Sequence, residues 1–252
     1  MRMSGNTILI TGGGSGIGRA LAEAFHQRGN QVIIASRRMA RLQATIDANP
    51  GMLAIELDVT QPEAILRVGR RLIAEHPDLN VLINNAGVML LDNVAGPVDE
   101  ALLVTTVTTN IGGAVRMSGA LIDHLKTRPD AVIINVTSVL GFVPLSATAA
   151  YSATKAALHS YTLSQRYSLR AAGVKVIELA PPWVRTELLN STEEERAMPL
   201  TDFIADVMAQ LATDTDEILV GEARQMRSNP GPDEHAWVAQ FNDLVLGGAP
   251  LG

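Results

Sequence analysis

A serine, a tyrosine and a lysine are spaced so that they could move a proton together. Tyr151 and Lys155 are four residues apart in a stretch expected to be helical, so their side chains would share one face. A nearby ammonium favours the phenolate, so we expect the pKa of Tyr151 to fall from about 10 towards neutrality. Ser138 follows the apolar run 131–136, which predicts a buried parallel strand with the serine hydroxyl at its carboxyl end. These residues predict proton transfer at the edge of a sheet where open α/β folds bind ligands.

A glycine-rich turn near the amino terminus is a second signal. It follows a predicted strand at 7–10 and precedes an amphipathic helix at 17–28. Its glycines are spaced Gly12-x3-Gly16-x-Gly18, which allows a tight turn and lets backbone N–H groups approach a pyrophosphate at the helix amino end. We therefore expect a dinucleotide site; the alternative is a glycine-rich connector without a ligand.

The end of the second predicted strand, 31–35, bears on the choice of cofactor. An acidic residue there binds the ribose 2′-hydroxyl of NAD, whereas basic residues suit the 2′-phosphate of NADP. This chain has Ser36, Arg37 and Arg38 and no nearby carboxylate, which favours NADP over NAD. The alternative is that the two arginines only begin an exposed helix that continues to Ala48.

The rest of the chain repeats the strand and helix pattern. Further strands are expected at 52–57, 81–83, 131–136, 174–179 and 217–220. Because such crossovers are right-handed, we expect an α/β fold with a three-layer, doubly wound parallel sheet (a Rossmann fold) in a single domain over 1–252. Within that domain, we expect 1–180 mainly to bind the dinucleotide, 181–215 to form a lid over the substrate, and 216–252 to supply the last strand and a tail. The apolar residues of that tail would cover the domain or meet a partner chain.

Three turns or breaks add further candidates. Asp58 ends the third predicted strand, where its carboxylate would accept from an adenine amino group or cap the next helix. Residues 84–87, Asn-Asn-Ala-Gly, form a turn of the kind that packs against a ligand, although any turn favours these residue types. Asn110 lies in the middle of a long helix expected at 99–128, beside two glycines, which predicts a local distortion or a role beside the ligand.

Composition excludes several classes of protein. The net charge of −6 argues against binding to nucleic acid, and the absence of cysteine excludes disulfides, thiolate nucleophiles and cysteine-ligated zinc. We expect no metal site. No apolar window is long enough for a membrane span and no signal peptide is evident, so we expect a cytoplasmic protein.

Taken in order, these motifs resemble those of the short-chain dehydrogenase/reductase superfamily along nearly the whole chain. The matching pieces are Thr11-Gly-x3-Gly-x-Gly18, Asp58-Val59, Asn84-Asn-Ala-Gly87, Asn110, Ser138, Tyr151-x3-Lys155 and Pro181-x-x-Val-x-Thr186. Within the superfamily, residues 36–38 and the tail are most similar to bacterial DltE-like oxidoreductases. The resemblance implies an enzyme that moves a hydride between a nicotinamide cofactor and a small-molecule carbonyl or alcohol.

The resemblance also implies a role for each catalytic residue. Tyr151 would be the acid in carbonyl reduction and the base in alcohol oxidation, and Ser138 would hydrogen-bond the substrate oxygen. Lys155 would bind the nicotinamide ribose, and Asn110 would hold a water for a proton relay.

Besides Tyr151 and Lys155, the cofactor contacts so implied are Gly12, Ser15, Ile17 and Gly18 at the pyrophosphate, Arg37 and Arg38 at the 2′-phosphate, Asp58 and Val59 at the adenine, Asn85, Ala86 and Gly87 at the neighbouring ribose, and Thr186 at the carboxamide or phosphate. One departure is Pro182, because the family usually has glycine there.

Substrate and assembly follow from the same reasoning. The positions expected to line the substrate pocket are mostly apolar and predict a hydrophobic ketone, aldehyde or secondary alcohol: Val139, Leu140, Phe142, Val143, Leu145, Trp183 and Leu188. The family forms homodimers and homotetramers through the helices that here contain Asn110 and Tyr151. An alternative function is a redox sensor on the same fold without turnover, which all four catalytic residue types argue against. A sugar-nucleotide epimerase or dehydratase would need a substrate domain after residue 200.

Overall fold

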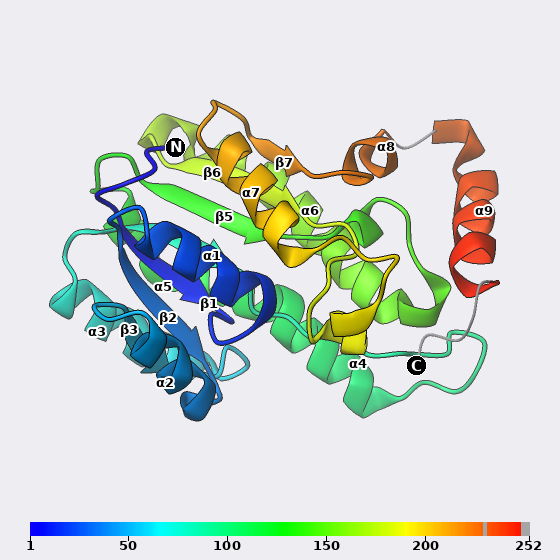
Figure 1. Cartoon of the computed structure of the whole chain (residues 1–252), viewed down its shortest axis with the longest axis horizontal. Helices are drawn as coiled ribbons and strands as arrows, with labels where there is room; N and C mark the ends of the chain where they lie inside the picture. Colours follow the sequence, from blue (N-terminus) through cyan, green and yellow to red (C-terminus); the bar gives the residue numbers. More distant parts are fainter. Residues whose placement is uncertain (229–230, 248–252) are drawn as a thin grey trace.

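Seven parallel strands form one sheet in the order β3-β2-β1-β4-β5-β6-β7, with helices on both faces (Figure 1). This computed structural model describes residues 1–228 and 231–247. The strands are β1 Thr7–Thr11, β2 Gln31–Ser36, β3 Leu53–Glu56, β4 Leu79–Asn84, β5 Val132–Val136, β6 Lys175–Ala180 and β7 Glu217–Leu219. The strand order reverses between β1 and β4, which confirms the predicted doubly wound Rossmann fold.

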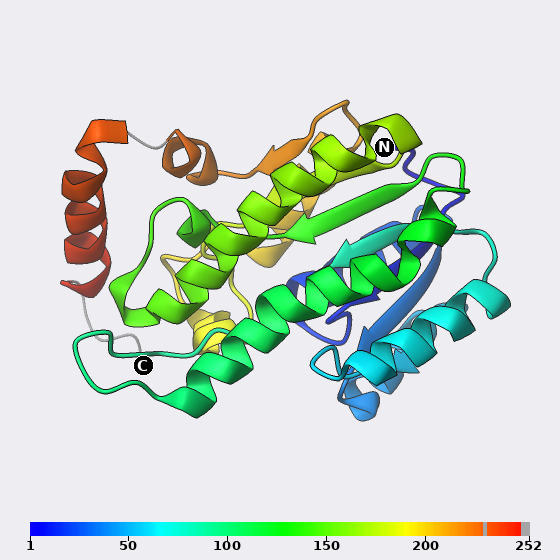
Figure 2. The ribbon, with the colours of Figure 1, turned by 180° about the vertical axis from the view of Figure 1, so that it is seen from behind.

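Two helical layers enclose the sheet. The helices are α1 Gly16–His26, α2 Met39–Ala48, α3 Pro62–Glu75, α4 Glu100–Val107, α5 Gly113–Leu125, α6 Ala149–Leu169, α7 Leu200–Leu211, α8 Ala223–Arg227 and α9 Glu234–Leu246. Helices α1, α2 and α7 cover one face, and α3, α5 and α6 cross the other (Figure 2).

Burial on both faces explains why the strands are continuous apolar runs. In β1, Ile8 and Ile10 contact the cluster beneath α1 and α7, whereas Leu9 contacts the cluster beneath α3 and α5. Successive side chains of a strand point to opposite faces, so most positions of a doubly covered strand are apolar. The buried polar exceptions, such as Asn135 of β5 and Glu178 of β6, have hydrogen-bond partners.

The long helix predicted at 99–128 is interrupted, as its sequence indicated. Helix α4 leads into a π-helical turn at Thr108–Gly112, and α5 continues from Gly113. A Cβ on Gly113 would lie 2.9 Å from the Val59 side chain, so the glycine allows α5 to start close to the loop after β3. The distortion brings Asn110 to the edge of the sheet where β4 ends.

The carboxyl-terminal helices close one end of the molecule. In α9, Trp237, Val238 and Phe241 pack against a cluster that includes Tyr151. The tail therefore covers the domain, which was one of the two predicted roles of its apolar residues. Asn242 fixes α9 to the loop before α6, because its amide group donates to the Pro144 carbonyl at 2.9 Å. Residues 229–230 and 248–252 of the predicted tail lie outside the described residues.

Within residues 1–228 and 231–247, no helix is both long enough and apolar enough to cross a membrane.

Candidate active site

The glycine turn after β1 is held closed by the turn that follows β4. Asn85 donates from its amide nitrogen to the carbonyls of Thr11 and Gly12, at 3.0 and 3.3 Å. A Cβ on Gly18 would lie 2.3 Å from that nitrogen and 2.4 Å from the Gly12 carbonyl oxygen. Gly12 and Gly16 have φ angles of +70° and +52°, which favour glycine. The turn therefore needs its glycines, and it exposes the amino end of α1 as a site for a pyrophosphate.

A cavity of about 490 Å³ runs from this turn along the carboxyl ends of the strands. Its size is in the range of cofactor and ligand sites. All the residues predicted to bind the cofactor line it: Gly12, Ser15, Ile17, Gly18, Arg37, Arg38, Asp58, Val59, Asn85, Ala86, Gly87, Tyr151, Lys155 and Thr186. Ser138 also lines it, whereas Asn110 does not. The fold thus brings residues from along much of the chain to one elongated site.

The serine, tyrosine and lysine meet at the inner end of the cavity. Tyr151 and Ser138 share a side-chain hydrogen bond, and the Lys155 ammonium lies 5.5 Å from the centre of the Tyr151 ring. Lys155 donates to the Val136 carbonyl at 2.8 Å. A Cβ on Gly141 would lie 2.9 Å from the Lys155 backbone, so the turn after Ser138 packs directly on α6. The predicted juxtaposition of the three side chains is therefore present.

The predicted lowering of the tyrosine pKa is wrong for this structure. Burial raises the pKa of Tyr151 to about 12, and the hydrogen bond with Ser138 only partly opposes that rise. Burial also lowers the pKa of Lys155 to about 8. The ammonium contacts the Val136 carbonyl rather than the phenol oxygen, and desolvation therefore dominates both groups. The phenol carries its proton at neutral pH, which suits a proton donor.

Asn110 does not line the cavity but hydrogen-bonds to Val88, which does. Its side-chain oxygen accepts from the Val88 N–H at 2.8 Å, and its amide donates to the Val88 carbonyl at 2.9 Å and to the Thr154 hydroxyl at 3.1 Å. The side chain is buried, with 1% exposed. It fixes the chain after β4 to α6, and the predicted water relay stays a prediction.

The outer end of the cavity carries the basic residues that follow β2. Arg37 and Arg38 are exposed and, within the described part of the chain, neither forms an ion pair. Arg41, which the sequence analysis missed, pairs with Glu187 and so joins α2 to the segment after β6 across the cavity. The signal for Arg41 was its position four residues after Arg37 in the sequence.

Asp58 closes a turn and does not cap a helix. Its carboxylate accepts from the N–H and the hydroxyl of Thr60, at 2.9 and 2.8 Å. Helix α3 begins at Pro62 with Gln61 as its N-cap residue, so the capping alternative is wrong. Asp58 still lines the cavity, where an adenine contact stays a prediction.

The substrate end of the cavity is largely apolar. Of the predicted lining residues, Val139, Leu140, Leu145, Trp183 and Leu188 line it. Phe142 and Val143 do not, which corrects the prediction. They turn into the core instead, where the Phe142 and His159 rings lie edge to face with centroids 5.2 Å apart.

The apolar lining residues that sequence reasoning missed include Met89, Met226, Phe241 and Val245. Three of these come from α8 and α9, which no motif connects to the site. The apolar spacing of Trp237, Phe241 and Val245 was the signal that predicts a helix with one buried face.

The segment between β6 and α7 lines the cavity and is held by contacts of its own. The Trp183 indole donates to the Ser191 hydroxyl at 2.9 Å, and Val184 forms a bridge with Met198. Pro182 lies in this segment and also lines the cavity. Thr186 lies against the glycine turn, since a Cβ on Gly16 would be 3.5 Å from its Cβ.

The doubly wound parallel sheet, the glycine turn after β1 and the buried Tyr151 are together typical of a nicotinamide-dependent oxidoreductase. The sequence model of the short chain dehydrogenase family matches residues 6–197, and the chain belongs to that family. It is therefore an enzyme that acts on a CH–OH group or the corresponding carbonyl.

Three similar proteins illustrate the relationship. The uncharacterized oxidoreductase DltE of Bacillus subtilis is 39% identical over 202 residues, which cover 79% of each chain. A short chain dehydrogenase from Burkholderia cenocepacia, solved in complex with NADP, has a TM-score of 0.85 at 29% identity and covers 96% of this chain and 99% of its own. The 3-ketoacyl-(acyl-carrier-protein) reductase of Brucella melitensis, solved with NADH, has a TM-score of 0.77 at 25% identity and covers 84% of this chain and 93% of its own.

Proposed function

We propose that this enzyme is an NADP-dependent carbonyl reductase or alcohol dehydrogenase that acts on a hydrophobic ketone, aldehyde or secondary alcohol. The observation that carries the proposal is the buried, protonated phenol of Tyr151 at the inner end of a cavity that begins at a glycine turn. When bound, the nicotinamide cofactor supplies the hydride.

The chain's own residues handle the substrate oxygen and its proton. The Ser138 hydroxyl donates a hydrogen bond to the oxygen as negative charge develops there. Tyr151 gives its proton to that oxygen in reduction and takes it back in oxidation. Lys155 lies 5.5 Å from the ring and, while charged, favours the phenolate that remains. These roles account for the burial of all three side chains.

The proposed preference for NADP over NAD rests on the positive charge of two arginines that follow β2. Arg37 and Arg38 line the cavity and make no ion pair among the described residues, so their guanidinium groups are available to a 2′-phosphate. We expect Arg37→Ala to weaken NADPH binding and to leave NADH binding unchanged in fluorescence titrations. Arg28→Ala, at an arginine that follows α1 and does not line the cavity, is the control. Equal loss for both cofactors would contradict the assignment.

A hydrophobic substrate is supported by the apolar end of the cavity. Leu140, Trp183, Met226 and Phe241 come from four separate segments and converge there. Their contact with an apolar group would stabilise its complex by roughly 25 cal/mol for each Å² removed from water. The test is a panel of acetophenone, straight-chain aldehydes and a charged keto acid, each with NADPH. Faster turnover of the charged acid would contradict the proposed substrate class.

We also propose a homodimer or homotetramer formed through α4 and α6. Leu103, Val104 and Val107 on α4 and Leu163 on α6 are exposed apolar residues, whereas Leu158 on α6 belongs to the core. Exposed apolar residues of this size mark an association surface when they are contiguous. Val107→Glu should reduce the mass measured by light scattering, and an unchanged mass would argue against this surface.

A further inference from the structure

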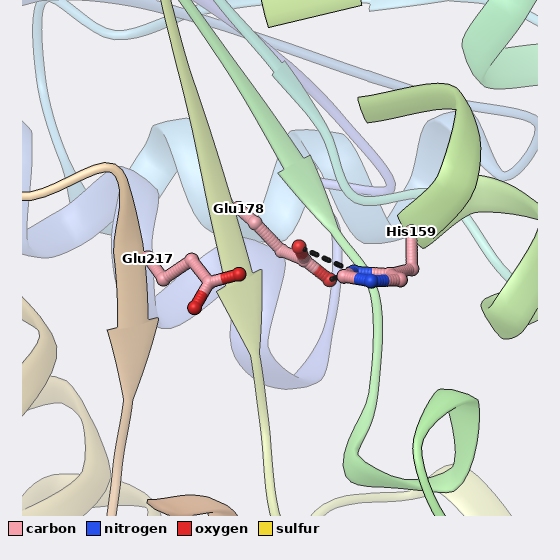
Figure 3. Close-up of side chains that lie close together, drawn as sticks. All are labelled: His159, Glu178 and Glu217. Atoms are coloured by element: carbon pink, nitrogen blue, oxygen red, sulfur yellow. Dashed lines mark hydrogen bonds and ion pairs between the residues drawn. The ribbon is translucent and has the colours of Figure 1, made fainter. Parts of the chain in front are cut away.

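A fully buried carboxylate lies beside the candidate active site without belonging to the cavity. Glu178, on β6, has an exposed fraction of 0%. Its oxygens lie 2.8 and 3.0 Å from Nδ1 of His159 on α6, and the Thr137 hydroxyl donates to it at 2.7 Å. Figure 3 shows the carboxylate directed at the histidine ring. Because a buried carboxylate is costly unless its oxygens are paired, both partners are needed to keep it there.

A metal ion is a competing explanation for this cluster. Ligand atoms of His159, Glu178 and Glu217 all lie within 4.8 Å of one another. However, Arg227 donates to Glu217 at 3.0 Å, and the other two side chains are bonded to each other. Every member already has a partner within the protein, so the geometry favours a hydrogen-bonded network.

The network connects one face of α6 to the end of β5. Tyr151, Lys155 and His159 follow one another at intervals of four residues, so they form one row on the helix. Each is linked to one of three successive residues, the last residue of β5 and the two that follow it. The links are Lys155 to the Val136 carbonyl, His159 through Glu178 to Thr137, and Tyr151 to Ser138.

We propose that Glu178 and His159 are positioning residues that fix Ser138 through Thr137, an inference that rests on the proposed function. Ser138 has an extended backbone, with φ −170° and ψ 155°, so its side chain and that of Thr137 point to opposite sides. Anchoring the Thr137 hydroxyl on one side therefore fixes the direction of the Ser138 hydroxyl on the other. Neither positioning residue lines the cavity.

The test compares variants that remove or retain the Thr137 hydroxyl. Thr137→Val removes it with little change in shape, and Thr137→Ser retains it. We expect Thr137→Val and His159→Leu each to lower kcat by about tenfold or more, since misplacing a reacting group by about 1 Å can cost 10²-fold. Thr137→Ser should keep kcat close to that of the wild type. The NADPH Kd should stay unchanged in all three variants.

A matched control separates positioning from general stability. Thr162→Val removes a buried hydrogen bond between α6 and Asn135 of β5, at 3.0 Å, away from the site. It should lower the Tm about as much as Thr137→Val does and leave kcat unchanged. A loss of kcat in Thr162→Val equal to that in Thr137→Val would overturn the inference.

A double variant identifies the residue through which the network acts. In a Ser138→Ala background, Thr137→Val should cause no further loss of kcat, because the group that it positions is gone. The inference is overturned if Thr137→Val causes the same fractional loss with and without Ser138, or none in the wild type. If Tyr151→Phe keeps full activity, the proposed function itself is contradicted, and that outcome is distinct from the others.

Discussion

Replacing Lys155 with methionine should stabilise the protein at neutral pH while removing a residue of the site. In the folded protein without cofactor, burial lowers the pKa of Lys155 from 10.5 to about 8. Each tenfold change in proton affinity is worth about 1.4 kcal/mol, so burial of the charged form costs about 3 kcal/mol. Methionine removes this cost but leaves the Val136 carbonyl without its donor, a loss of about 1 kcal/mol. The expected net gain at pH 7 is about 2 kcal/mol.

The pH dependence gives the sign of the effect. A lysine whose folded pKa is lowered destabilises the fold fully below that pKa, near 8, and the cost is relieved as the pH rises to 10.5. The free energy of unfolding of the wild type should therefore rise from pH 8 towards pH 10, and that of Lys155→Met should not. Tyr151 acts in the opposite sense, because its pKa of about 12 causes stability to fall only above pH 10.

The assay is urea unfolding of both proteins without cofactor at pH 7 and pH 9.5, at one protein concentration. Lys126→Met, at an exposed lysine after α5, is the control and should change the free energy of unfolding by less than about 0.5 kcal/mol at either pH. A Lys155→Met protein that is less stable than the wild type at pH 7 would contradict a net cost of burying the Lys155 ammonium. A difference that does not change between the two pH values would refute it as well.

Three other substitutions have defined outcomes. Gly18→Ala should abolish NADPH binding and lower the Tm, because its Cβ would lie 2.3 Å from the Asn85 amide nitrogen; normal NADPH titration would contradict this. Gly119→Ala, in α5 with nothing within 4 Å of its Cβ, should instead raise the free energy of unfolding by about 1 kcal/mol in urea. Phe241→Ala should raise KM for apolar ketones at constant NADPH Kd, and an unchanged KM would remove α9 from the substrate site.

The sheet, the glycine turn and the pairing of Tyr151 with Lys155 could be predicted from the sequence because their causes are local. A strand buried on both faces is mostly apolar, as in β1 and β5, and a turn that approaches a pyrophosphate needs glycines such as Gly12 and Gly18. Helical periodicity likewise placed Tyr151 and Lys155 on one face of α6.

Other features depend on contacts between distant segments and could not be predicted in this way. The pKa of Tyr151 rises because the phenol is buried, and the Lys155 ammonium hydrogen-bonds to the Val136 carbonyl. The spacing of Tyr151 and Lys155 in the sequence indicates neither the burial nor this hydrogen bond. Phe142 turns into the core because His159 and Arg227 offer its ring contacts there. The place of α9 beside the cavity depends in the same way on tertiary packing.

We propose that Tyr151 passes a proton to a carbonyl in a cavity that binds NADP. This proton transfer can be tested by one turnover of an apolar ketone by enzyme saturated with NADPH, followed by the loss of nicotinamide absorbance. The NADPH Kd is measured on the same samples. Tyr151→Phe should bind NADPH as the wild type does and react about 10²- to 10⁴-fold more slowly, the usual contribution of a positioned acid. Equal rates for the two proteins, or no binding of NADPH by the wild type, would contradict the account.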